Sequence, residues 1–113
     1  MPFTDQQAID VYIAALNRAA AIEICIASSV FTREDANSLR VAWESVNAGV
    51  LAQGQAAAAA RGIHADGPGG LRFFAKMTAD LLNSLPADDR NRRCQEALDG
   101  YRANPEPEGQ PKR

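Results

Sequence analysis

The sequence has few of the residues on which metal sites and many catalytic sites depend. It contains one histidine, two cysteines and no CxxC pair. A single histidine cannot complete a zinc ligand set, so we expect no metal centre. A nucleophile elbow, a paired-acid motif and a Gly-Lys-Ser/Thr phosphate loop are also missing. We therefore expect a protein that is not an enzyme and that carries no cofactor.

An excess of positive charge and long apolar runs are missing too. The formal net charge is −2, so nothing in the balance favours nucleic acid or an anionic membrane as a partner. No stretch reaches about 18 unbroken apolar residues, the length typical of a transmembrane helix. The first five residues, Met-Pro-Phe-Thr-Asp, lack the charged-then-apolar order of a secretion signal. We expect a cytoplasmic protein, or a periplasmic one if a signal peptide was removed.

Alanine is abundant, whereas proline is scarce and threonine scarcer still. Alanine has the highest helix propensity, and the six prolines stand near the chain's ends or at breaks such as Pro68 and Pro86. This composition predicts an all-α fold, which we interpret as a four-helix, mainly antiparallel bundle with two long N-terminal helices and two shorter C-terminal ones. The preference for arginine over lysine, ten to two, favours a GC-rich bacterial source.

Four helical segments can be placed from caps and apolar periodicity. Thr4 and Gln7 form a capping box that starts the first helix, and Thr32 caps a segment that runs to Gly62. A loop with four glycines and Pro68 follows, and then come helices over about 71–85 and 87–102. We place a single domain at 1–103. The proline-rich and charged residues 104–113 predict a disordered tail.

The segment from Thr32 to Gly62 would be about 43 Å long as one helix, which is long for so small a domain. Trp43 lies on its apolar seam, and Gln53 occupies a later position on the same seam. The helix should therefore either break near Gly49 or Gly54 or use these small residues to let a second chain approach closely. We slightly favour the second alternative, a homodimer.

Two charged residues fall on apolar helix faces. Glu23 lies among Ile and Leu positions of the first helix, and Arg90 lies on the stripe of the last one. A buried Glu23–Arg90 pair is one interpretation, with Glu23 as a candidate ligand contact. A solvated Glu23 at the edge of the stripe is the alternative that we favour.

The glycine-rich loop holds the only histidine, His64, and leads to Arg72 at the start of the third helix. Gly-rich loops often carry binding residues, and the free N–H groups of a helix start can hold an anion. A plain connector explains the glycines equally well, and we favour it.

Cys25 and Cys94 could form a disulfide between the first and last helices in an oxidising compartment. Because no secretion signal is visible, we favour two reduced, buried thiols.

These observations favour a small bacterial interaction protein, an adaptor or regulatory subunit, with a protein partner and a homodimeric state. One alternative is a helical module that binds a small molecule in a pocket lined by Tyr12, Trp43 and Phe74, with Glu23 or His64 as the polar contact. Another is a periplasmic, disulfide-stapled protein of the immunity or inhibitor type.

Overall fold

The computed structural model describes residues 2–105, which are helical and contain no strand. The all-α prediction is therefore confirmed. The elements are five α-helices and two 3-10 turns: α1 (Asp5–Ala27), α2 (Arg33–Val46), α3 (Ala48–Ala60), α4 (Leu71–Asp80), η1 (Leu81–Ser84), α5 (Ala87–Asp99) and η2 (Gly100–Arg102). Within this part of the chain, none of the helices combines the length and the apolarity needed to cross a bilayer.

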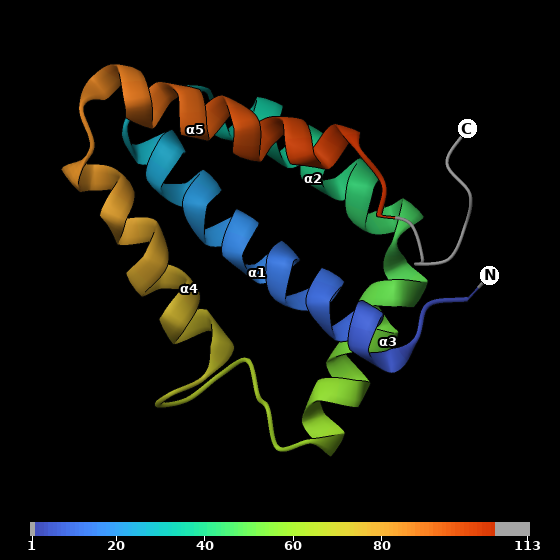
Figure 1. Cartoon of the computed structure of the whole chain (residues 1–113). Helices are drawn as coiled ribbons and strands as arrows, with labels where there is room; N and C mark the ends of the chain where they lie inside the picture. Colours follow the sequence, from blue (N-terminus) through green and yellow to red (C-terminus); the bar gives the residue numbers. More distant parts are fainter. Residues whose placement is uncertain (1, 106–113) are drawn as a thin grey trace.

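The longest helix, α1, lies in the middle of the molecule (Figure 1). Helices α2 and α5 run back along its second half, and α4 follows its other side in roughly the same direction as α1 (Figure 1). Helix α3 turns away from α2 and crosses the first half of α1. Helices α3, α4 and α5 therefore all pack against α1, whereas α2 approaches it less closely.

The predicted helix starts agree with the structure. The Thr4 side chain accepts a hydrogen bond from the Gln7 N–H, and the Gln7 side chain accepts one from the Thr4 N–H, which completes the capping box. Thr32 caps α2 by accepting from the N–H of Asp35 at 3.2 Å. The starts of both helices could be predicted because the groups that stabilise them are close together in the sequence.

The segment from Thr32 to Gly62 is two helices, and it breaks at Asn47, two residues before Gly49 and thus near one of the two expected positions. The buried Asn47 side chain donates to the Trp43 carbonyl at 2.9 Å and to Asn104 Oδ1 at 3.2 Å. These bonds fix the side chain at the point where α2 ends. The four-helix count is consequently not confirmed, because this break gives five helices within residues 2–105.

The apolar interior forms two clusters, one on each half of α1. The first joins α1 to α2 and the C-terminal elements and is built on Ile22, Ala36, Trp43, Leu98 and Tyr101. The second joins α1 to α3 and the loop before α4 and is built on Ile9, Tyr12 and Ala58. Val46, the last residue of α2, belongs to neither cluster and is exposed.

Two close contacts hold α1 to its neighbours. A Cβ atom added at Gly54 would lie 2.1 Å from the Ala8 carbonyl oxygen, so α3 can approach α1 only because this position is glycine. At the other end of α1, Cys25 and Cys94 form a disulfide to α5, with their Cα atoms 5.7 Å apart. The structure therefore joins the two cysteines that the sequence favoured as reduced thiols.

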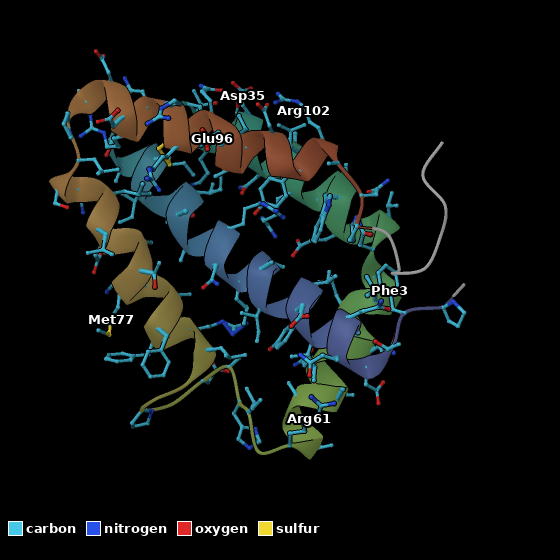
Figure 2. The ribbon with its side chains drawn as sticks, in the orientation of Figure 1. Phe3, Asp35, Arg61, Met77, Glu96 and Arg102 are labelled. Carbon is cyan, nitrogen blue, oxygen red and sulfur yellow. A yellow bond between two sulfur atoms is a disulfide. The ribbon has the colours of Figure 1, made fainter. Side chains whose placement is uncertain are left out.

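Helix α4 packs on α1 through small residues rather than through its large apolar ones. Ala75 and Ala79 are buried, whereas Phe74 and Leu81 are exposed. Two alanines allow the helix axes to approach closely, and the large side chains then point outward. Figure 2 shows Met77 directed away from α1.

The chain after η2 returns to the end of α2. The Ala103 carbonyl accepts a hydrogen bond from Trp43 Nε1 at 2.8 Å, and Asn104 accepts one from Asn47. Asn104 is therefore held by the domain, although we had placed it in the tail. The rest of the predicted tail, residues 106–113, lies outside the described residues.

Candidate functional site

Two surface features could have a function: an apolar helix face and a charged cleft. The first is the α4 face, which we define as Phe73, Phe74, Met77 and Leu81. Between 52% and 66% of each of these side chains remains exposed. Successive members are one to four residues apart, so they form a single stripe along α4 and the start of η1.

A groove of about 710 Å³ runs beside the α4 face and shares Leu81 with it. Leu82 and Leu85 line it from the α4 side, and Ala97 lines it from α5. On the opposite flank of the stripe stand Lys76 and Asp80, one helical turn apart. Both are exposed, and neither forms an ion pair with another residue in 2–105.

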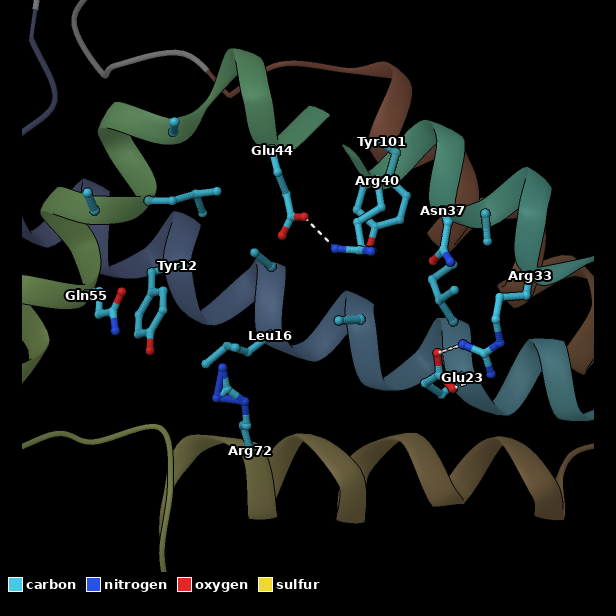
Figure 3. A pocket seen from close by; sticks show the side chains of 17 residues that line it. Tyr12, Leu16, Glu23, Arg33, Asn37, Arg40, Glu44, Gln55, Arg72 and Tyr101 are labelled. Atoms are coloured by element: carbon cyan, nitrogen blue, oxygen red, sulfur yellow. Dashed lines mark hydrogen bonds and ion pairs between the residues drawn. The ribbon is translucent and has the colours of Figure 1, made fainter. Parts of the chain in front are cut away.

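The second feature is a cleft of about 650 Å³ between α1 on one side and α2 and α3 on the other (Figure 3). Small and apolar residues of α1, among them Ala15, Leu16 and Ala19, form its floor. Arg72 reaches toward this floor from α4 (Figure 3). The cleft lies between the two apolar clusters, where α2 diverges from α3.

Ion pairs line the walls of the cleft. Arg33 donates two hydrogen bonds of 2.8 Å to the two carboxylate oxygens of Glu23, and Arg40 donates one of 2.6 Å to Glu44. The hydrogen bonds from the Arg33 guanidinium hold the pKa of Glu23 below its ordinary value, although desolvation by burial acts in the opposite direction. Each glutamate therefore already has an arginine partner.

Arg72 is bound less tightly than the other arginines of the cleft. Its contact with Asp66 is 3.3 Å long, and 87% of the Asp66 side chain is exposed to solvent. Surface pairs of this kind contribute little and are easily exchanged. The Arg72 guanidinium is therefore available to another anion.

An aromatic cluster supports the cleft from behind. The rings of Trp43 and Tyr101 lie 5.9 Å apart, and the Arg18 guanidinium lies over both of them, at 5.4 and 5.3 Å. Cation–π contacts of this kind hold the rings in place. Tyr101 also lines the cleft, and burial raises the pKa of its hydroxyl, which keeps it protonated at neutral pH.

The structure places the two charged candidates, Glu23 and Arg90, apart from each other. Glu23 is 57% exposed and pairs with Arg33, so the buried Glu23–Arg90 link does not form. Glu23 stands at the edge of its stripe, as in the alternative that we favoured. Arg90 is half-buried on α5, and its Nε atom has no hydrogen-bond partner within residues 2–105.

The first two N–H groups of α4 are not free to bind an anion. The Leu71 and Arg72 N–H groups donate, at 2.9 Å each, to the carbonyls of His64 and Ala65 in the preceding loop. The loop therefore caps the helix with its own backbone. The exposed His64 side chain lines a smaller hollow, of about 270 Å³, which shares Tyr12 and Gln55 with the cleft.

The remaining candidates fall into three different environments. Gln53 ties α3 to the N-terminal segment by donating to the Phe3 carbonyl and to Asp5, at 3.0 Å each. Gly54 is buried against α1, whereas Gly49 faces open space. The small residues that we had expected to meet a second chain are thus partly used inside the molecule.

The pocket expected from Tyr12, Trp43 and Phe74 is not formed, because only Tyr12 lines the cleft. Trp43 is buried behind it, and Phe74 belongs to the α4 face. We did not single out Arg33, Arg40 and Glu44 from the sequence. They lie on the polar side of α2, and their spacing is typical of any solvent-exposed helix face. No group of three or more metal-ligating side chains gathers among the residues described.

Comparisons with protein-family models, with curated proteins and with solved structures gave no match for this chain. Any functional conclusion must therefore come from the two features themselves.

Proposed function

We propose that the protein is a small, non-enzymatic interaction protein, an adaptor or regulatory subunit, that works as a homodimer through the α4 face. The observation that supports this proposal is the orientation of α4. The helix uses Ala75 and Ala79 against α1 and leaves two phenylalanines, a methionine and a leucine in solvent. Exposed apolar groups gathered in one stripe are typical of a protein-contact surface.

The area of the stripe fits the centre of an interface. A buried phenylalanine covers 150–250 Å², so four half-exposed side chains present about 400 Å² of apolar surface. A standard interface buries about 800 Å² on each partner, with an apolar centre and a polar rim. The groove that shares Leu81 with the stripe extends the surface toward that size.

The charges beside the stripe favour a second copy of this chain as the occupant. Lys76 and Asp80 lie on the same flank, and neither has an intramolecular ion-pair partner in the described part of the chain. If two α4 helices cross antiparallel about a two-fold axis near Thr78, Lys76 of each copy meets Asp80 of the other. The same surface is then complementary to itself in both charge and hydrophobicity.

Sedimentation equilibrium in the micromolar range tests the proposal. We expect a dimer for the wild-type protein and a monomer for Met77→Glu, because the substitution places a charge in the centre of the apolar contact. Val46→Glu is the matched control, since Val46 is an exposed apolar residue on α2, outside the α4 face, and is more accessible than Met77. It should leave the dimer intact. A wild-type monomer, or loss of the dimer in Val46→Glu but not in Met77→Glu, would overturn the proposal.

The disulfide favours an oxidising compartment, such as the periplasm, as the place where the protein works. Disulfides persist in such compartments and are rare in the cytosol. This observation supports the alternative of an extracytoplasmic, disulfide-stapled protein without deciding what it contacts. Thiol titration of protein isolated from its native cells should detect no free cysteine before reduction.

A further inference from the structure

The cleft between α1 and the α2–α3 pair has the properties of a small-molecule site. Its volume of about 650 Å³ lies within the 300–1,000 Å³ range of ligand pockets. Its floor is apolar, and polar groups converge on it from α2, α3 and α4 (Figure 3). An apolar pocket with a few converging polar groups is the usual form of a binding site.

Two buried tyrosines open their hydroxyls into the cleft. Tyr12 and Tyr101 are 9% and 6% exposed, yet neither hydroxyl hydrogen-bonds another residue that lines the cleft (Figure 3). Neither hydroxyl is among the enclosed side-chain polar atoms that lack a partner in residues 2–105, so both are open to solvent in the cleft. A ligand in the cleft could therefore accept a hydrogen bond from either of them.

The charges that line the cleft favour a ligand of negative charge. Three arginines and two glutamates line the cleft, which leaves one positive charge in excess. Glu23 and Glu44 neutralise Arg33 and Arg40, so the excess belongs to Arg72. Arg72 and the hydroxyl of Tyr12 both lie beside Leu16, at the α3 end of the cleft (Figure 3).

We propose that this cleft binds a small amphipathic acid whose carboxylate is held by Arg72 and the Tyr12 hydroxyl. The apolar body of the ligand lies along Leu16 and Ala19 toward Ile22. The forked guanidinium matches the geometry of a carboxylate, and the exposed Asp66 is the anion that the ligand displaces. Because the carboxylate carries a single charge, it balances the excess charge of the walls.

Calorimetric titration with octanoate tests whether the cleft requires both a negative charge and an apolar body in its ligand. We expect octanoate to bind, and we expect octylamine, which carries the opposite charge, and acetate, which lacks the apolar body, not to bind measurably. Amide signals of residues 15–22 and of Gln55 should shift with octanoate in NMR spectra. Equal binding of octylamine, or shifts confined to other surfaces, would contradict the proposed site.

Two arginine variants provide a matched pair. Arg72→Ala should weaken octanoate binding about tenfold or more, the size expected for a lost hydrogen bond to a charged group. Arg92→Ala should leave it unchanged, because Arg92 is similarly exposed and pairs with Asp89 on α5 outside the cleft. Both substitutions lie on the surface, and unchanged melting curves would show that the fold is kept. If Arg72→Ala and Arg92→Ala bind octanoate as the wild type does, Arg72 does not hold the carboxylate.

Discussion

At the scale of single residues, the two glycines of α3 show how differently one residue type can be used. Gly54 lies in van der Waals contact with the backbone of α1, and a Cβ there would also come within 2.8 Å of the Tyr12 Cβ. Gly49, one and a half turns earlier, has no atom within 4 Å of the same hypothetical position. Only Gly54 is therefore required by the packing.

Substituting alanine at these two positions should give opposite results. Gly54→Ala should lower the free energy of unfolding by about 3 kcal/mol, because α3 must move away from α1. Gly49→Ala should raise it by up to about 1 kcal/mol, since alanine restricts the unfolded chain and favours the helix. Urea unfolding followed by circular dichroism measures both. A neutral Gly54→Ala would contradict the close α1–α3 contact.

The Glu23–Arg33 pair makes a pH-dependent contribution to stability. Because the pKa of Glu23 is lowered in the folded state, its contribution is fully present above the unfolded pKa of about 4.3 and is lost as the pH falls through the folded pKa. Glu23→Gln should lower the melting temperature by a few degrees at pH 7.

The same substitution should lose its effect as the pH falls through the folded pKa of Glu23, because the carboxyl is then protonated in both states. Melting temperatures measured from pH 2 to pH 8 test the two halves of this expectation. An effect of Glu23→Gln that is equal at all pH values would show that the ion pair is not its cause.

At the scale of elements, local signals fixed the helix starts, and tertiary contacts decided the rest. Thr4 and Thr32 were predictable as caps because their partners are three residues away. The small residues predicted a break near Gly49, but its place at Asn47 depends in part on Asn104, which is 57 positions away. The outward face of α4 could not be predicted, because apolar periodicity does not tell which stripe of a helix is buried.

The same reasoning explains which parts of the candidate sites were foreseen. Glu23, Tyr12 and Arg72 were singled out from sequence, and the structure brings all three to one cleft. The α2 residues that line the cleft could not be foreseen, because the side of α2 that faces the cleft depends on where the helix ends. The glycine-rich loop, by contrast, proved to be a cap for α4.

The disulfide links α1 to α5 across a sequence separation of 69 residues. Closing so long a loop restricts the unfolded chain, and removing such a bond typically costs about 2–5 kcal/mol. We expect the Cys25→Ala/Cys94→Ala variant to unfold at a correspondingly lower urea concentration than the oxidised protein. Reduced wild-type protein is the control and should behave as the variant does. Equal stability of the oxidised and reduced forms would mean that α1 and α5 do not depend on the link.

At the scale of the whole molecule, the fold presents different surfaces on the two sides of α4. Its flank toward α1 contributes Arg72 to the charged cleft, and its outward face presents four large apolar side chains. A homodimer formed through that face would bury the stripe and pair Lys76 with Asp80 across the two-fold axis. The dimer contact is therefore the central claim about this protein.

An isotope-filtered NOE experiment on an equimolar mixture of ¹³C-labelled and unlabelled protein tests this contact most directly. The proposal predicts intermolecular cross-peaks from the Met77 and Leu81 methyl groups of labelled copies to the Phe73 and Phe74 rings of unlabelled ones. Intermolecular cross-peaks that fall instead on Gly49–Ala60 of α3, or a spectrum without any, would contradict it.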